Sequence, residues 1–206
     1  MWQALYEELG PEVFVPFAVA FDSGGNAAAE PWIAAASPTY PCVIDRKHIV
    51  AELYDMVNVP SAVWIDEQGM IVRPNDVAFG SEIFKDLTGF DSVSYLEAVR
   101  AWVRDGTLPF DRGAVRSMQM LPSPEEQLAR AEFGLAWHLH QAGRSEAAVR
   151  HFERAGALSP DDFTIRRGSM PIRGIDPMAS PEFLELYQEW TARGRPYYRP
   201  RPASSS

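Results

Sequence analysis

The chain has 206 residues, of which 46% are hydrophobic and 23% charged, as is ordinary for a globular protein. Its 28 acidic and 19 basic side chains give a net charge of −9. This argues against a general nucleic-acid binder, because such proteins need a basic face. The single cysteine excludes an internal disulfide, a cysteine-rich zinc site and a Cys-x-x-Cys redox pair within these residues. No apolar run approaches the roughly 20 residues that span a bilayer.

The charge is divided unevenly along the chain. Residues 1–115 carry 17 acidic and 7 basic side chains, whereas residues 116–206 carry 11 acidic and 12 basic ones. Prolines, glycines and a Ser-Pro helix start lie between the two halves, and such residues mark turns and linkers. We therefore expect an α/β module at residues 1–110, a linker at 111–124, an all-α helical module at 125–192 and a disordered tail at 193–206.

Apolar spacing predicts alternating helices and strands in the first module. A helix that ends at Gly10 has one apolar face, made of Trp2, Leu5, Tyr6 and Leu9. The apolar run 13–22 is typical of a strand buried on both faces, although Pro16 lacks a ladder donor. The elements that follow are a helix at 27–36, a strand at 41–44, a helix with the face Ile49, Val50, Leu53, Tyr54 and Val57, a hairpin of strands 62–66 and 70–73, and a helix at 92–104. In the second module we expect helices at 125–142, 145–158 and 181–192.

The segment NVPSAVWIDEQGMIV, with the elements before it, resembles thioredoxin-like proteins of the ResA/TlpA or AhpC-TSA redoxin type over roughly residues 1–105. QALYEELGPEVFVPFAVAFD resembles the helix end and strand that follow the dithiol in that group. The resemblance implies a cis peptide at Pro60, a geometry that proline tolerates far better than other residues. It also implies that Val59, Pro60 and Ser61 present backbone to an extended substrate. The structural alternative is an ordinary proline that opens a strand.

The chain departs from this family where its chemistry resides. No Cys-x-x-Cys is present, so no catalytic residue is assigned in this chain. The family's central strand, which would lie between residues 13–21 and 62–65, is also missing, so both strands would lack their shared neighbour. We therefore hypothesise an N-terminally truncated form of a longer protein, whose missing segment carries cysteine or selenocysteine. The alternative is a degenerate redoxin that retains only a binding role.

Two functions follow from these patterns. By resemblance the chain belongs to thiol–disulfide oxidoreductases or peroxide-reducing redoxins with a protein thiol or disulfide as partner, but it is expected to be inactive as given. The alternative is a non-catalytic interaction module. No ligand cluster suggests a metal or cofactor, and MWQALYEELG lacks the regions of a signal peptide, so a cytoplasmic location is expected unless an upstream export signal exists. Cys42 is expected to be a core residue, because free cysteines are usually buried.

Residues 129–162 resemble one tetratricopeptide repeat. The resemblance assigns helix packing to Leu135, Ala136, Leu139, Ala148, Phe152, Ala155 and Pro160. One repeat cannot bury its own apolar face, so it must pack on the last helix, on the first module or on a second subunit in a homodimer. His138 and His140 point to different helix faces, which argues against a shared metal. We expect Arg166, Arg167 and Arg173 to pair with the acidic first module rather than to hold an anion.

Overall fold

The computed structural model describes residues 1–78, 85, 90–119 and 121–194. They form a mixed α/β protein that is 53% helical and contains two small sheets. Part of the predicted tail at 193–206 lies outside the described residues. No helix in the described ranges is long and apolar enough to cross a membrane.

The first module alternates short helices and strands in the predicted order. It begins with α1 (Trp2–Leu9), β1 (Ala18–Ala20), α2 (Asn26–Ala36) and β2 (Cys42–Ile44). It continues with α3 (Ile49–Leu53), the hairpin of β3 (Ser61–Ile65) and β4 (Ile71–Val77), and α5 (Ser92–Asp105). Asp91 caps α5 by accepting hydrogen bonds from the backbone N–H groups of Val93 and Ser94, and Gly106 ends it with a φ of 69°.

Two details of this prediction are wrong. Of the apolar run 13–22, only Ala18–Ala20 is a strand, and Val13, Val15 and Phe17 are exposed rather than buried. The prediction of a buried apolar face on α3 is also wrong, because Ile49 and Leu53 are exposed. With five residues, α3 is too short to present a second turn to the core.

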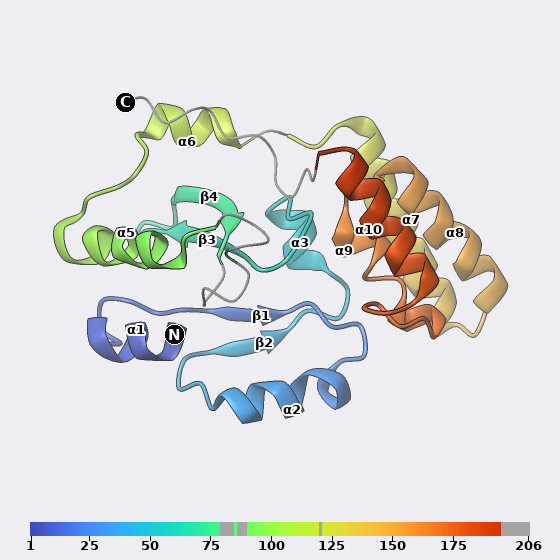
Figure 1. Ribbon diagram of the computed structural model, residues 1–206, viewed down its shortest axis with the longest axis horizontal. Helices are drawn as coiled ribbons and strands as arrows, with labels where there is room; N and C mark the ends of the chain where they lie inside the picture. The colour runs from blue at the N-terminus through green and yellow to red at the C-terminus, as the bar shows by residue number, and fades with distance from the viewer. Residues whose placement is uncertain (79–84, 86–89, 120, 195–206) are drawn as a thin grey trace.

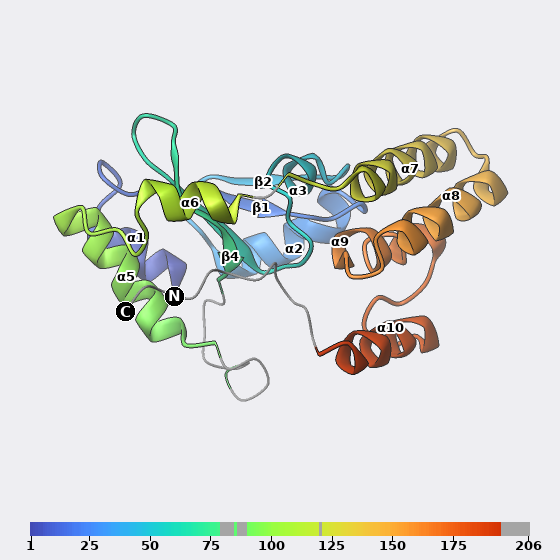
Figure 2. The same ribbon diagram turned by 90° about the horizontal axis from the view of Figure 1, so that it is seen from above.

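The four strands form two separate pairs. β1 runs parallel to β2, with Ala18 opposite Cys42, and β3 runs antiparallel to β4, with Ser61 opposite Val77. Within the described residues no ladder joins the two sheets. Figure 1 shows β1 and β3 as the inner strands, and in the view from above the two sheets overlap (Figure 2). Among the described residues, each inner strand therefore has a ladder on one side.

The core of the first module lies between α1, β3 and α5. Its buried side chains include Leu5, Trp64, Tyr95, Leu96 and Val99. The Trp64 indole N–H donates to the Tyr95 hydroxyl at 2.7 Å, which satisfies a polar atom inside this apolar cluster. Burial of each large apolar side chain contributes about 1.5–3 kcal/mol, so this cluster holds the hairpin on the two helices.

The predicted linker is partly helical. Asp111 caps α6 (Arg112–Met118) by accepting from the backbone N–H of Ala114 at 2.8 Å. The buried Val115 faces inward, and α6 contacts β4. Residues 112–118 of the predicted linker are therefore a helix that packs on the first module.

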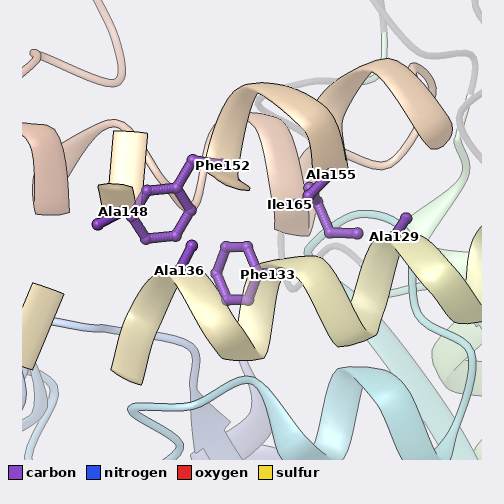
Figure 3. Close-up of a cluster of buried hydrophobic side chains, with 7 residues drawn as sticks. All are labelled: Ala129, Phe133, Ala136, Ala148, Phe152, Ala155 and Ile165. Carbon is purple, nitrogen blue, oxygen red and sulfur yellow. The ribbon is translucent and has the colours of Figure 1, made fainter. Parts of the chain in front are cut away.

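The second module is built from α7 (Pro124–Gln141), α8 (Ser145–Leu158), α9 (Phe163–Arg166), the 3-10 turn η2 (Pro171–Arg173) and α10 (Pro181–Ala192). Ser123 and Glu126 form a capping box that fixes the start of α7. Figure 3 shows the core between α7, α8 and α9, made of Ala129, Phe133, Ala136, Ala148, Phe152, Ala155 and Ile165. In Figure 1 these helices occupy the half of the molecule opposite to α1 and α5.

The last helix covers α9 and the turn after it. Phe163, Met170, Leu186 and Trp190 form a buried cluster there. The helix pair thus packs within its own chain, on this C-terminal segment and on the first module.

Candidate functional site

The residues Val59, Pro60 and Ser61 form a fixed loop at the start of β3. The peptide between Val59 and Pro60 is cis, as predicted. Asn58, which is 3% exposed, braces the loop on both sides. Its Oδ1 accepts from the Val59 backbone N–H at 2.8 Å, and its carbonyl accepts from the Ser61 hydroxyl at 2.7 Å. Two hydrogen bonds to one buried residue hold the backbone of this loop in place.

Beyond this loop, β3 has one free edge. The Pro60 carbonyl accepts from the Ala78 N–H, and the Asp66 N–H donates to the Met70 carbonyl. Backbone N–H and C=O groups point to alternate sides along a strand. Those of Ser61, Val63 and Ile65 therefore point away from β4. Among the described residues, β4 is the only strand that forms a ladder with β3. Val59 is 44% exposed beside them. Loop and edge together form a backbone surface that an extended chain can pair with.

The one thiol is placed away from this surface. Cys42 opens β2, which is the outer strand of the other sheet (Figure 1). Its Sγ donates to the Tyr40 carbonyl at 3.7 Å, and burial raises the pKa of the thiol. The reactive form of cysteine is the thiolate, which a raised pKa disfavours at neutral pH. Cys42 is half-buried rather than a full core residue, and its surroundings do not activate it.

The packing residues that the repeat resemblance assigns are mostly found in the helix core. Ala136, Ala148, Phe152 and Ala155 are buried, and Leu139 packs beside them. Leu135 is an exception, because it is 43% exposed. The buried side of α7 comprises Ala129, Glu132, Phe133, Ala136 and Trp137, a spacing of three and four residues that leaves Leu135 outside it. Pro160, which follows α8, is exposed and does not belong to the buried cluster between α7 and α8.

The arginines of residues 166–173 pair within their own module. Arg166 contacts Glu189 at 2.8 Å and Arg173 contacts Glu182 at 2.5 Å, and both partners lie on α10. Arg167 donates to the Pro177 carbonyl at 2.9 Å. Intramolecular pairing is therefore confirmed, but the predicted acidic partner in the first module is wrong. The sequence could not decide this, because charge alone does not say which carboxylate is near.

His48, which the sequence analysis did not single out, joins the two modules. Its ring is 4% exposed and stacks between Phe21 at 5.8 Å and Phe133 at 5.2 Å. Its Nδ1 donates to the Thr164 carbonyl at 3.0 Å. A Cβ built at Gly168 would lie 2.6 Å from His48 Cε1, so only glycine fits the packing there. Nothing in the local pattern of His48 signals this role, because all three contacts come from distant residues.

An ion pair completes the same joint. Arg130 contacts Asp162 at 2.6 Å and also donates to the Met56 carbonyl at 2.9 Å. The Phe163 N–H donates to the Val57 carbonyl at 2.8 Å. These bonds tie α7 and α9 to the chain just ahead of Asn58. The helical module therefore supports the segment that carries the Val59–Ser61 loop.

A pocket of about 220 Å³ lies between α3, β4 and α6. Arg73, the basic residue of its wall, already contacts Asp76 of the same wall at 2.6 Å. The guanidinium of Arg73 also lies 4.8 Å from the Trp64 ring and 4.7 Å from the Tyr95 ring. An arginine that is paired and stacked in this way serves the core rather than a ligand. In the parts of the chain that the structure describes, no three His, Cys, Asp or Glu side chains gather as for a metal.

Comparison with known proteins returns no match, whether to family models, to curated proteins or to solved structures. The loop at Val59–Ser61, the free edge of β3 and the joint that supports them are therefore the features on which a function can be argued.

Proposed function

We propose that this chain is a protein-interaction module whose first part is thioredoxin-like and whose second part is a tetratricopeptide-like helix pair. Val59, Pro60 and Ser61, with the edge of β3, hold an extended polypeptide. The observation that carries the proposal is the braced loop on Asn58 that leads directly into a free strand edge. A fixed backbone pays less conformational entropy on binding, and an extended chain supplies the complementary donors and acceptors.

Thiol–disulfide exchange or peroxide reduction is the second candidate. The order of helices and strands in the first module favours it. It needs a thiolate or selenolate that attacks a disulfide near Pro60. Cys42 does not supply one, because it lies in the other sheet and its thiol pKa is raised. This activity is therefore proposed only for a longer chain that adds such a group.

The proposed binding is tested with an unfolded basic protein as probe. Reduced and carboxamidomethylated lysozyme is extended and has no thiol, and the acidic first module should attract it. We expect saturable binding by fluorescence anisotropy, and we expect Val59→Lys to weaken it. Val93→Lys, a change at an exposed valine on α5, is the matched control and should bind like the parent.

The same preparation separates the two candidates. In an insulin reduction assay with dithiothreitol we expect no acceleration by the parent chain or by Cys42→Ser. Acceleration that Cys42→Ser abolishes would replace the binding proposal with catalysis by this chain. Equal binding of the parent and Val59→Lys would remove the loop from the site.

A further inference from the structure

The free edge of β1 lies across from the free edge of β3. The Ala18 N–H donates to the Pro41 carbonyl at 2.9 Å, and the Ala20 carbonyl accepts from the Asp45 N–H at 2.8 Å. By alternation, the backbone groups of Phe17, Val19 and Phe21 point away from β2. Among the described residues, β2 is the only strand that forms a ladder with β1. Figure 1 shows β1 between β2 and β3, so the two unpaired edges face each other.

The proline that precedes β3 does not remove a donor from the inner edge of this strand. Pro60 has the parity of Ala62, and its carbonyl accepts from the Ala78 N–H, so its missing N–H group falls on the side that faces β4. Proline at a solvent edge normally has its donor-free side outward, where it discourages further pairing. At Pro60 the arrangement is the opposite, so the inner edge of β3 keeps its donors.

The inner edges also lack the charged side chains that discourage an exposed strand from pairing with another chain. No charged residue occurs in 13–21 or 61–65. Phe17 is 62% exposed and Ile65 is 43% exposed, each beside or on an unpaired edge. Native edges are usually protected by lysine, by bulges or by a covering element. The β3–β4 ladder has two register shifts, but neither inner edge carries a charge, and uncharged edges that face each other suit two strands that share one neighbour.

We propose that these two edges take up one extended segment of another polypeptide, which pairs with β1 and β3 at once. This inference rests on the proposed function, since it extends binding at the edge of β3 to a second edge. The occupant needs both of its own edges free. None of the four described strands of a second copy has both edges free, because β1 pairs with β2 and β3 pairs with β4.

The chemistry of the occupant follows from its surroundings. A strand with neighbours on both sides lies inside the sheet, so it should be apolar on both faces. Its ends would lie near acidic groups, because Glu12, Asp22 and Asp66 border the two uncharged edges. With 17 acidic and 7 basic side chains in residues 1–115, basic flanks complement the module. We therefore expect about five apolar residues between basic ones.

The test uses the peptide Lys-Lys-Val-Val-Ile-Val-Val-Lys-Lys and amide hydrogen exchange of the full chain by NMR. On addition of the peptide, exchange should slow at least about tenfold at the two inner rows. These rows are Phe17, Val19, Phe21, Ser61, Val63 and Ile65. The control peptide carries N-methyl groups on its five apolar residues, which removes the donors but keeps side chains and charge. It should give no protection.

A matched pair of variants tests the same point on the protein. Phe17→Lys places a charge beside the edge at an exposed position, and we expect it to weaken peptide binding about tenfold or more. Met70→Lys adds the same charge at an exposed residue of the β3–β4 turn and should bind normally. If both variants keep the parent's backbone spectrum, folding is not the cause of any difference.

The outcomes separate this inference from the proposed function. Slowed exchange on both rows supports a shared strand. Slowing confined to Ser61, Val63 and Ile65 would overturn the shared strand but leave binding at β3 standing. No slowing on either row would overturn this inference, and the lysozyme experiment alone would then decide the proposed function.

Discussion

The two halves of this molecule finish their hydrogen bonding in different ways. In the helical module, α7 and α8 satisfy their own backbones and bury Phe133, Ala136 and Phe152 between them. In the first module, β1 and β3 each pair on one side and leave apolar residues such as Phe17 in solvent. Helices close their ladders locally, whereas strands depend on neighbours. The helices of the second module therefore satisfy their own backbones, whereas each inner strand of the first module has a ladder on one side among the described residues.

The largest expected loss of stability follows from a substitution in the core between α7 and α8. Phe152→Ala removes a side chain that is 3% exposed, and we expect a loss of about 3–5 kcal/mol in the free energy of unfolding, measured by urea denaturation. Leu135→Ala, at an exposed site on α7, should cost less than about 1 kcal/mol. Similar losses for both variants would contradict the packing described for α7 and α8.

The joint between the modules should show the next largest effect. Asp162 pairs with Arg130, accepts from the Thr164 hydroxyl at 2.6 Å and caps α9. Asp162→Ala leaves a buried guanidinium without this carboxylate, so we expect a loss of about 3 kcal/mol by denaturation. A double-mutant cycle with Arg130→Met should recover part of that loss. Strict additivity of the two changes would show that the pair is not coupled.

A pH dependence should arise from His48. Burial lowers its pKa, and Arg130 acts in the same direction, while the Thr164 carbonyl, Asp45 and Asp22 oppose the change. Well above the ordinary histidine pKa of about 6.5, the ring is neutral in both folded and unfolded states. As the pH falls below that value, the unfolded state takes up a proton first, so the free energy of unfolding should fall.

The size of this decrease is limited by the slope for one proton, about 1.4 kcal/mol per pH unit. Denaturation curves from pH 7.5 to 5 should therefore be flatter for His48→Phe than for the parent. His138→Phe, at an exposed histidine of α7, is the matched control and should keep the parent's slope. An unchanged slope in His48→Phe would mean that another group is responsible.

The smallest effect concerns Cys42. Because burial raises its pKa, the thiol should react with a thiol-specific reagent more slowly at pH 7 than a free cysteine peptide does. Unfolding in urea should restore the peptide rate. A native rate above that of the peptide would show an activated thiol and would revive redox chemistry at this residue.

Much of the fold was predictable where structure is local. The helices at 92–104, 145–158 and 181–192 follow from their apolar periods, and α5, α8 and α10 lie at these positions. Strand 62–66 was found through its turn residues. The run 13–22 could not be resolved in this way, since its burial depends on a neighbour that is not local.

The site was predictable only in part for the same reason. The cis peptide before Pro60 followed from a resemblance, but the bracing by Asn58 needs a turn whose geometry the pattern does not give. His48 was missed because Phe21, Phe133 and Thr164 lie far from it in sequence. Contacts between distant residues set both features, and no residue spacing encodes them.

The central claim, that β1 and β3 each have one unpaired edge, is tested most directly by amide hydrogen exchange of the chain alone. Groups that face a paired strand should be protected, and those on the inner edges should not. The account predicts slow exchange at Ala20 and Ala62 and fast exchange at Val19 and Val63. Equal protection at all four amides would contradict it, because the inner edges would then already be paired.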